Sequence, residues 1–180
     1  MRNSWQLWVQ GADQKALDWI EELAEETPST EATIFSGESN PKIRTSQVKW
    51  INNQELRDWL FIYVMQANAN AFNIDVQNIA EIQYTIYNSS EQGHYDSHHD
   101  INWSSDEAFD RKISVTVQLS STEEYEGGDF YFDEVEDVGA EVRTKGAVLV
   151  FPSYLRHKVT PVTRGIRKSL VAWFKGPRWR

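Results

Sequence analysis

Residues 93–100 read Gly-His-Tyr-Asp-Ser-His-His-Asp and hold three of the four histidines of the chain. In an extended strand, side chains two positions apart point to the same face. His98 and Asp100 would therefore project together, while His99 would point to the opposite face. The segment thus offers an imidazole and a carboxylate on one face, which are two ligands for a divalent metal ion.

A third ligand has to come from another part of the chain, and the only other histidine is His157. Two histidines and one carboxylate on one face of a metal leave the opposite positions open, which is the arrangement used for non-haem Fe(II) oxygen chemistry. Residues His94 and Asp96 form a second pair with the same spacing, and the spacing does not choose between the two pairs. A histidine-rich loop can also be ordinary polar surface, so the residues alone leave both questions open.

The composition favours one packed globular domain. The chain has 180 residues, of which 13% are aromatic, and it has no cysteine, which excludes disulfides, zinc–thiolate sites and iron–sulfur clusters. The N-terminus lacks the basic-then-apolar pattern of a signal peptide. The longest apolar run, Trp59 to Met65, is far too short to span a bilayer. We therefore expect a soluble cytoplasmic protein with no membrane partner.

The charge is unevenly divided along the chain. The net charge is −9, nine carboxylates lie between Glu123 and Glu141, and every charged residue after Glu141 is basic. Blocks of this kind are usually solvated faces. The overall acidity argues against a nucleic-acid partner and mildly favours a basic one.

The first part of the chain predicts two amphipathic helices and a few strands. Asp13 can cap a helix that runs to about Glu26, and Asn53 can cap a second helix that runs to about Ala69. A strand is expected at 4–10, a loop at 27–41 and an extended segment at 42–51. Neither helix carries a motif, so we expect both to be scaffold.

From Ile79 onward the pattern changes to short strands. Apolar residues alternate with polar ones, as in Ile113, Val115, Val117 and Leu119, which predicts a half-buried strand. Further strands are expected at 79–87, 129–132, 147–151, 159–162 and 169–175. The pattern predicts a mainly β fold with flanking helices, as a sandwich or barrel, in a single domain 1–180. Within it, 1–78 would give helical support and N-terminal strands, and 79–176 would form the core.

Several ordered motifs resemble Fe(II)/2-oxoglutarate dioxygenases of the prolyl 4-hydroxylase and PKHD-type hydroxylase family. Tyr87 with residues 93–100 resembles the family's Y…G-x-Y-x-x-H-x-D signature. The segment 119–130, Leu-Ser followed by Tyr-Glu-Gly-Gly-Asp-Phe, is similar to its L-S…Y-x-G-G-[ED]-[LF] hairpin. Residues 151–167 resemble the F-P-S…H-x-V-x-P-V-x-x-G-x-R segment of PKHD-type hydroxylases. The resemblance covers about 84–175, roughly half of the chain.

The resemblance implies a fold and a ligand set. The fold is a double-stranded β-helix, or jelly-roll, which agrees with the run of strands. The metal ligands would be His98, Asp100 and His157, and His94 would be a loop residue. Arg167 and Ser169 lie two apart on one strand and so share a face. The resemblance implies that this pair binds the distal carboxylate of 2-oxoglutarate, although an arginine can also be a plain surface charge.

The remaining site residues follow from the same resemblance. Tyr87 would bind the co-substrate, and Tyr95, Gln118 and Trp173 would line the pocket, although Trp173 could equally be a core residue. The segment 101–111 follows the metal motif and is expected to form a mobile lid at the substrate entrance. Its candidate contacts are Trp103, Asp106 and Glu107.

The activity implied is hydroxylation of a prolyl residue in a peptide or protein, with release of succinate and CO2. The cofactors would be Fe(II), 2-oxoglutarate and O2, and ascorbate is a further candidate. Acidic residues in the lid and between Glu123 and Glu141 suggest that proline-containing substrates are basic. Two alternatives stay open. The chain could hydroxylate a free amino acid or another small molecule, or it could be a non-catalytic jelly-roll binding module.

Overall fold

The computed structural model describes residues 3–32 and 40–179. Helix α1 spans Gln14–Glu25 and begins where predicted, because the Asp13 side chain accepts a hydrogen bond from the backbone N–H of Ala16 at 2.9 Å. Helix α2 spans Gln54–Ala67 and is capped by Asn53, whose side chain accepts from the N–H of Leu56 at 2.8 Å. Both predicted helix starts are confirmed.

A π-helical turn, Asn68–Phe72, follows α2 and ends at Asn73, which has a positive φ of 53°. Two short 3₁₀ turns lie farther along, at Ser89–Glu91 and Ala140–Arg143. Among the described residues, no helix is both long and apolar enough to cross a membrane. The expected cytoplasmic location stays a prediction.

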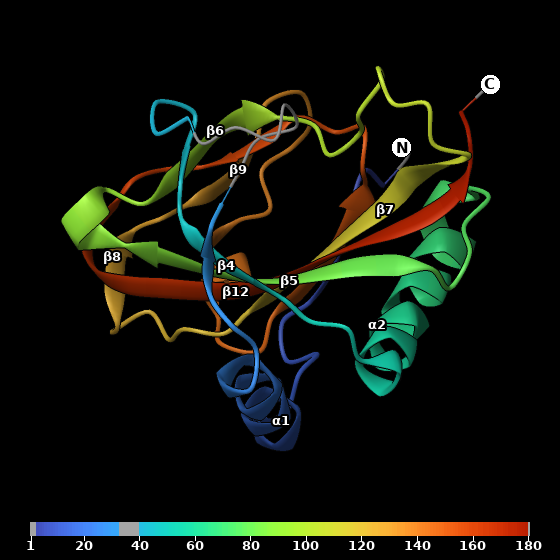
Figure 1. Cartoon of the computed structure of the whole chain (residues 1–180). Coiled ribbons are helices and arrows are strands. Elements are labelled where there is room, and N and C mark those ends of the chain that lie inside the picture. Colours follow the sequence, from blue (N-terminus) through green and yellow to red (C-terminus); the bar gives the residue numbers. More distant parts are fainter. Residues whose placement is uncertain (1–2, 33–39, 180) are drawn as a thin grey trace.

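Two antiparallel sheets make up most of the molecule (Figure 1). The large sheet has the order β1-β10-β7-β12-β5-β4-β2, with β8 paired to β12. The small sheet has the order β3-β6-β11-β9. The strands of the large sheet are β1 (Gln6–Trp8), β2 (Thr30–Glu31), β4 (Gln47–Trp50), β5 (Ala80–Asn88), β7 (Phe109–Gln118), β8 (Tyr125–Gly127), β10 (Val148–Pro152) and β12 (Val162–Pro177). Those of the small sheet are β3 (Arg44–Thr45), β6 (His94–His98), β9 (Phe130–Phe132) and β11 (His157–Val159).

The helices and the small sheet lie on opposite faces of the large sheet (Figure 1). Buried residues of α1 and α2 pack with those of β5, β7, β10 and β12 in one apolar cluster. A second cluster, which includes Phe130, Phe132 and Phe151, lies between the sheets. The predicted mainly β architecture with flanking helices is confirmed.

Strand β7 shows how this arrangement uses the alternating sequence. Ile113, Val115 and Val117 belong to the helix-side cluster, so Ser114 and Thr116 point toward the small sheet. The sequence predicted a half-buried strand, yet Ser114 is fully buried. The reason is that the small sheet covers the polar face, which therefore lines the interior instead of meeting solvent.

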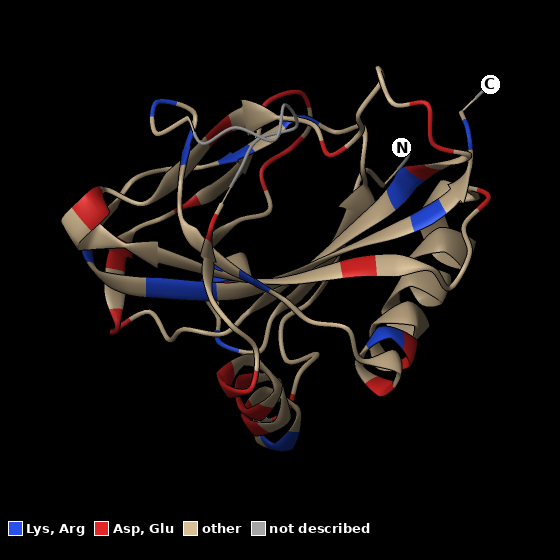
Figure 2. Cartoon of the chain, in the orientation of Figure 1, with Lys and Arg blue, Asp and Glu red and all other residues tan. Residues whose placement is uncertain are grey.

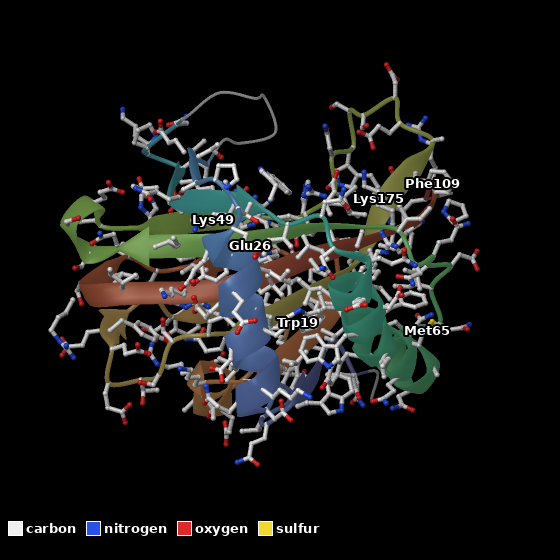
Figure 3. The ribbon with its side chains drawn as sticks, turned by 60° about the horizontal axis from the view of Figure 1, so that its bottom comes forward. Trp19, Glu26, Lys49, Met65, Phe109 and Lys175 are labelled. Atoms are coloured by element: carbon white, nitrogen blue, oxygen red, sulfur yellow. The ribbon has the colours of Figure 1, made fainter. Side chains whose placement is uncertain are left out.

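Polar contacts fix α1 on the large sheet. The ammonium of Lys49 on β4 donates to the carbonyl of Ala24 in the last turn of α1 at 2.7 Å. The hydroxyl of Tyr84 donates to Glu21 at 2.7 Å. Figure 3 shows Lys49 beside the end of α1 at Glu26, and Trp19 on the side of α1 that faces α2. Both helices thus brace the sheet on the side away from the polar interior, as the scaffold prediction requires.

Candidate active site

The structure brings His98, Asp100 and His157 together. Their potential ligand atoms all lie within 4.8 Å of one another. His98 stands at the end of β6 and is the cross-strand partner of His157 on β11, and Asp100 follows two residues after His98. The Nε2 atom of His98 lies 3.6 Å from Asp100 Oδ1, and the Nε2 atom of His157 lies 3.7 Å from Oδ2. Residues far apart in the chain thus meet because β6 and β11 pair.

Backbone carbonyls orient both imidazoles. The Nδ1 atom of His98 lies 2.7 Å from the carbonyl oxygen of Asp96, and that of His157 lies 2.9 Å from the carbonyl oxygen of Leu155. A carbonyl accepts only, so each Nδ1 carries the proton and donates it. Each Nε2 is then left with a lone pair that faces the carboxylate. This is the tautomer that a metal-ligating histidine requires.

A serine pair holds the carboxylate. Ser114 Oγ donates to Asp100 Oδ2 at 2.6 Å, and Ser153 Oγ lies 2.9 Å from Ser114 Oγ. The backbone N–H of Asp100 also donates to the carbonyl of Ser153 at 2.9 Å. All three residues are buried. The carboxylate is therefore fixed before any metal binds.

The electrostatics keep Asp100 and His157 in their ligating forms. Burial by itself would raise the pKa of Asp100, but His157, His98 and the Ser114 hydroxyl hold it well below its usual range. Burial lowers the pKa of His157 to about 4. At neutral pH the site therefore presents a carboxylate and a neutral imidazole in direct proximity, as a divalent cation requires.

The other two histidines stay outside this group. His94 begins β6 and its Nδ1 lies 2.9 Å from the carbonyl oxygen of Gln92. The ring of His99 meets Trp103 edge-on at 6.1 Å. The spacing left two H-x-D pairs open, and the tertiary structure joins only the pair of His98 and Asp100 with the distant His157. Two imidazoles and one carboxylate match the ligand set of non-haem Fe(II) oxygenases.

Arg167 lies in the same cavity as the three clustered residues. It is 6% exposed, and its Nη1 lies 3.5 Å from Ser169 Oγ. Its guanidinium carbon stands 5.6 Å from the ring centre of Tyr87, its cross-strand partner on β5. No carboxylate among the described residues lies within 4 Å of this guanidinium. A buried cation without an acid suits the carboxylate of a bound ligand.

The Gly-Gly turn before β9 makes room for Arg167. Gly128 has a positive φ of 62°, and a Cβ there would lie 2.9 Å from Arg167 Cδ and 2.9 Å from Val162. A side chain at this position would push the arginine stem aside. The sequence motif therefore has a direct physical role in shaping this end of the cavity.

The predicted pocket residues do not all reach the cavity. Tyr95 and Trp173 line it together with Tyr87. The Tyr95 ring stacks on the His98 imidazole with centres 3.4 Å apart, and burial raises the pKa of Tyr95 to about 12, so its hydroxyl stays protonated. Gln118 is buried outside the cavity lining, where its amide donates to Tyr125 Oη at 3.0 Å.

The expected entrance loop is tied down by ion pairs. Lys175 on β12 lies 3.1 Å from Glu107 and 2.9 Å from Glu81, and Arg111 on β7 lies 2.6 Å from Glu81. Figure 2 shows these basic segments of β7 and β12 beside the acidic segment of β5, at one end of the large sheet. Figure 3 places Lys175 close to Phe109 at the same end. Part of the acidic charge expected at the entrance is therefore neutralised within the protein.

A hollow at this end adjoins the site through Asp100 and is bordered by Glu107. Trp103, 58% exposed, and Asp106, also exposed, lie in the same loop but do not border the hollow. Of the three entrance residues expected from the sequence, Glu107 is thus the one that borders this hollow together with Asp100.

Sequence reasoning missed several residues that complete the site. Ser114 holds Asp100, and Arg44 lines the cavity although it lies in the N-terminal part of the chain. Polar residues at alternate positions of the apolar strand β7 were a usable signal for Ser114. No local signal marked Arg44. The cavity lining that was missed is Arg44, Gln83, Thr85, Thr116, Phe130, Phe151, Val159 and Val171.

The family model of the 2OG-Fe(II) oxygenase superfamily matches residues 82–175. A PKHD-type hydroxylase of Synechococcus sp. (strain JA-2-3B'a(2-13)) is 41% identical over 61 residues, which are 34% of this chain and 27% of that protein. The chain thus spans only about a quarter of that relative's length.

Two solved structures are similar over nearly the whole chain. A Pseudomonas putida prolyl-4-hydroxylase matches with a TM-score of 0.71 and 21% identity, over 97% of this chain and 93% of that one. A prolyl hydroxylase from Trichoplax adhaerens, in complex with a hypoxia-inducible-factor peptide fragment, matches with a TM-score of 0.74 and 15% identity, over 96% and 83%. These likenesses establish the fold, and the expected jelly-roll is confirmed.

Proposed function

Because the chain belongs to the 2OG-Fe(II) oxygenase superfamily, we propose that it is a 2-oxoglutarate-dependent dioxygenase that hydroxylates a prolyl residue of a peptide or protein. The observation that carries the proposal is one cavity that contains both the cluster of His98, Asp100 and His157 and the buried guanidinium of Arg167, which has no ion pair with a carboxylate of the described residues. The family and the donor set identify the cofactors as Fe(II) and 2-oxoglutarate.

In this proposal, His98, Asp100 and His157 hold the iron on one face. When bound, iron with 2-oxoglutarate and O2 supplies the oxidising chemistry, which releases succinate and CO2 and delivers a hydroxyl group to the prime substrate. Arg167 and Ser169 hold the distal carboxylate of 2-oxoglutarate and so fix its orientation. The rings of Phe130 and Phe151 border the cavity and exclude water from it.

The prolyl substrate is supported by the prolyl hydroxylases among the structural neighbours, one of which is in complex with a peptide. Basic flanking residues are supported by exposed carboxylates that have no ion pair within the described residues, namely Asp106, Glu134, Glu136 and Asp137. These exposed carboxylates would speed the encounter with a basic chain at low salt. Ascorbate would serve as an accessory reductant, and leaving it out of the assay tests that part.

The test is succinate formation from 2-oxoglutarate, with mass spectrometry of proline-containing peptides. Substituting His98, Asp100 or His157 by Ala should abolish both Fe(II) binding and turnover, since the set has no spare ligand. His94→Ala and His99→Ala are matched controls and should keep both. Inactivation by His94→Ala with an active His98→Ala would show that the ligand assignment is wrong.

A further inference from the structure

Arg44 is a second buried guanidinium in the cavity. It lies on β3, directly across from Tyr95 on β6, and it is only 7% exposed. Its guanidinium carbon stands 4.6 Å from the centre of the Tyr95 ring, and that ring stacks on His98. A layered contact thus runs from Arg44 through Tyr95 to a residue of the metal cluster.

Among the described residues, the groups that contact the guanidinium of Arg44 are neutral. Its Nε donates to Ser46 Oγ at 3.0 Å, and its Nη2 donates to Gln83 Oε1 at 2.6 Å. A guanidinium has five N–H donors, so three stay without an acceptor in the part of the chain that the structure describes. Arg44 also borders a surface hollow with Glu91, and no ion pair joins these two residues.

The charges of the cavity leave Arg44 uncompensated. The lysine, arginine, aspartate and glutamate side chains that line it are Arg44, Arg167 and Asp100. If the proposed function is right, Fe(II) and the dianion of 2-oxoglutarate cancel each other. Asp100 then ligates the metal and Arg167 pairs with the distal carboxylate of 2-oxoglutarate. The charges of Asp100 and Arg167 cancel, so the positive charge of Arg44 remains. A buried charge is costly unless it is paired.

We propose that Arg44 binds a carboxylate of the prime substrate. This inference rests on the proposed function and narrows the substrate to molecules that carry an acidic group close to the reacting carbon. Two sources share that chemistry, namely the α-carboxylate of a free amino acid and the acidic side chain of a peptide. Gln83 and Ser46 hold one edge of the guanidinium and leave its other donors for a two-pronged contact with a carboxylate.

The experiment measures recognition directly. Protein labelled with ¹⁵N and loaded with Zn(II) and 2-oxoglutarate is titrated with acetate and, separately, with acetamide. The Nε–H resonance of Arg44, assigned by its loss in Arg44→Gln, should shift in a saturable way with acetate and stay unmoved with acetamide. An equal response to both probes, or no response to acetate, would overturn the proposal. Binding of 2-oxoglutarate is followed separately at the Nε–H resonance of Arg167. A resonance of Arg167 that does not respond to 2-oxoglutarate would contradict the proposed function, whereas the response of Arg44 to acetate tests the further inference.

Turnover then distinguishes the two sources. L-Proline is compared with L-prolinamide, and the blocked peptide acetyl-Gly-Pro-Asp-Gly-amide with its Asn counterpart. Wild type should prefer the acidic member of one pair by about tenfold or more, as expected for a hydrogen-bonded charge. Arg44→Gln should erase that preference, and Arg44→Lys should keep part of it. A preference that survives in Arg44→Gln, or a raised KM for 2-oxoglutarate in that variant, would show that Arg44 does not bind the substrate carboxylate.

Discussion

The Ser114→Ala variant should weaken metal binding without unfolding the protein. The Ser114 hydroxyl donates to Asp100 Oδ2 at 2.6 Å, and both residues are buried, so water does not replace the lost bond. A hydrogen bond to a charged group contributes about 1.5–3 kcal/mol. Loss of a group that positions a metal ligand costs roughly 10- to 100-fold in metal affinity. The two ranges agree, because about 1.4 kcal/mol corresponds to a factor of ten.

The assay is calorimetric titration of Mn(II), a redox-stable substitute for Fe(II), into metal-free protein with 2-oxoglutarate present. The matched control is Ser120→Ala. Ser120 is also a buried serine, but it accepts from the backbone N–H of Lys168 at 2.9 Å and takes no part in the metal cluster. Ser120→Ala should lower the unfolding temperature and leave the affinity for Mn(II) unchanged. Binding by Ser114→Ala within about twofold of wild type, or equal losses in both variants, would refute the reasoning.

Two further predictions concern the co-substrate and pH. Arg167→Ala should weaken 2-oxoglutarate binding by roughly 30-fold or more, because it leaves a carboxylate unpaired, and Arg167→Lys should lose less. Calorimetric titration of 2-oxoglutarate checks this, and an unchanged affinity in Arg167→Ala would assign the carboxylate to another cation. The metal-free protein should lose stability as the pH falls from about 6.5 toward 4, because the unfolded chain takes up the His157 proton first. Urea unfolding at pH 7, 5.5 and 4.5 should show a steep decline in wild type and a shallower one in His157→Asn, and equal slopes would contradict this cause.

The sequence by itself determined the local elements and the candidate ligands. Helix starts at Asp13 and Asn53 follow from side chains that cap free backbone N–H groups, which is a local effect. The alternation of β7 follows from the two-residue period of a strand. The ordered motifs around His98 and Arg167 indicated the site, because each motif keeps its candidate binding side chains within a few positions of one another.

Only the tertiary structure decided which polar residues meet. Arg44 reaches Tyr95 and Gln83 through the pairing of β3 with β6 and the closure of the small sheet over the large one. The sequence did not show that Glu107 forms an ion pair. Its partner, Lys175, lies 3.1 Å away near the end of β12. Contacts of this kind join residues far apart in the chain. Their energy depends on distance and burial, which strand order sets and which no local pattern of residues encodes.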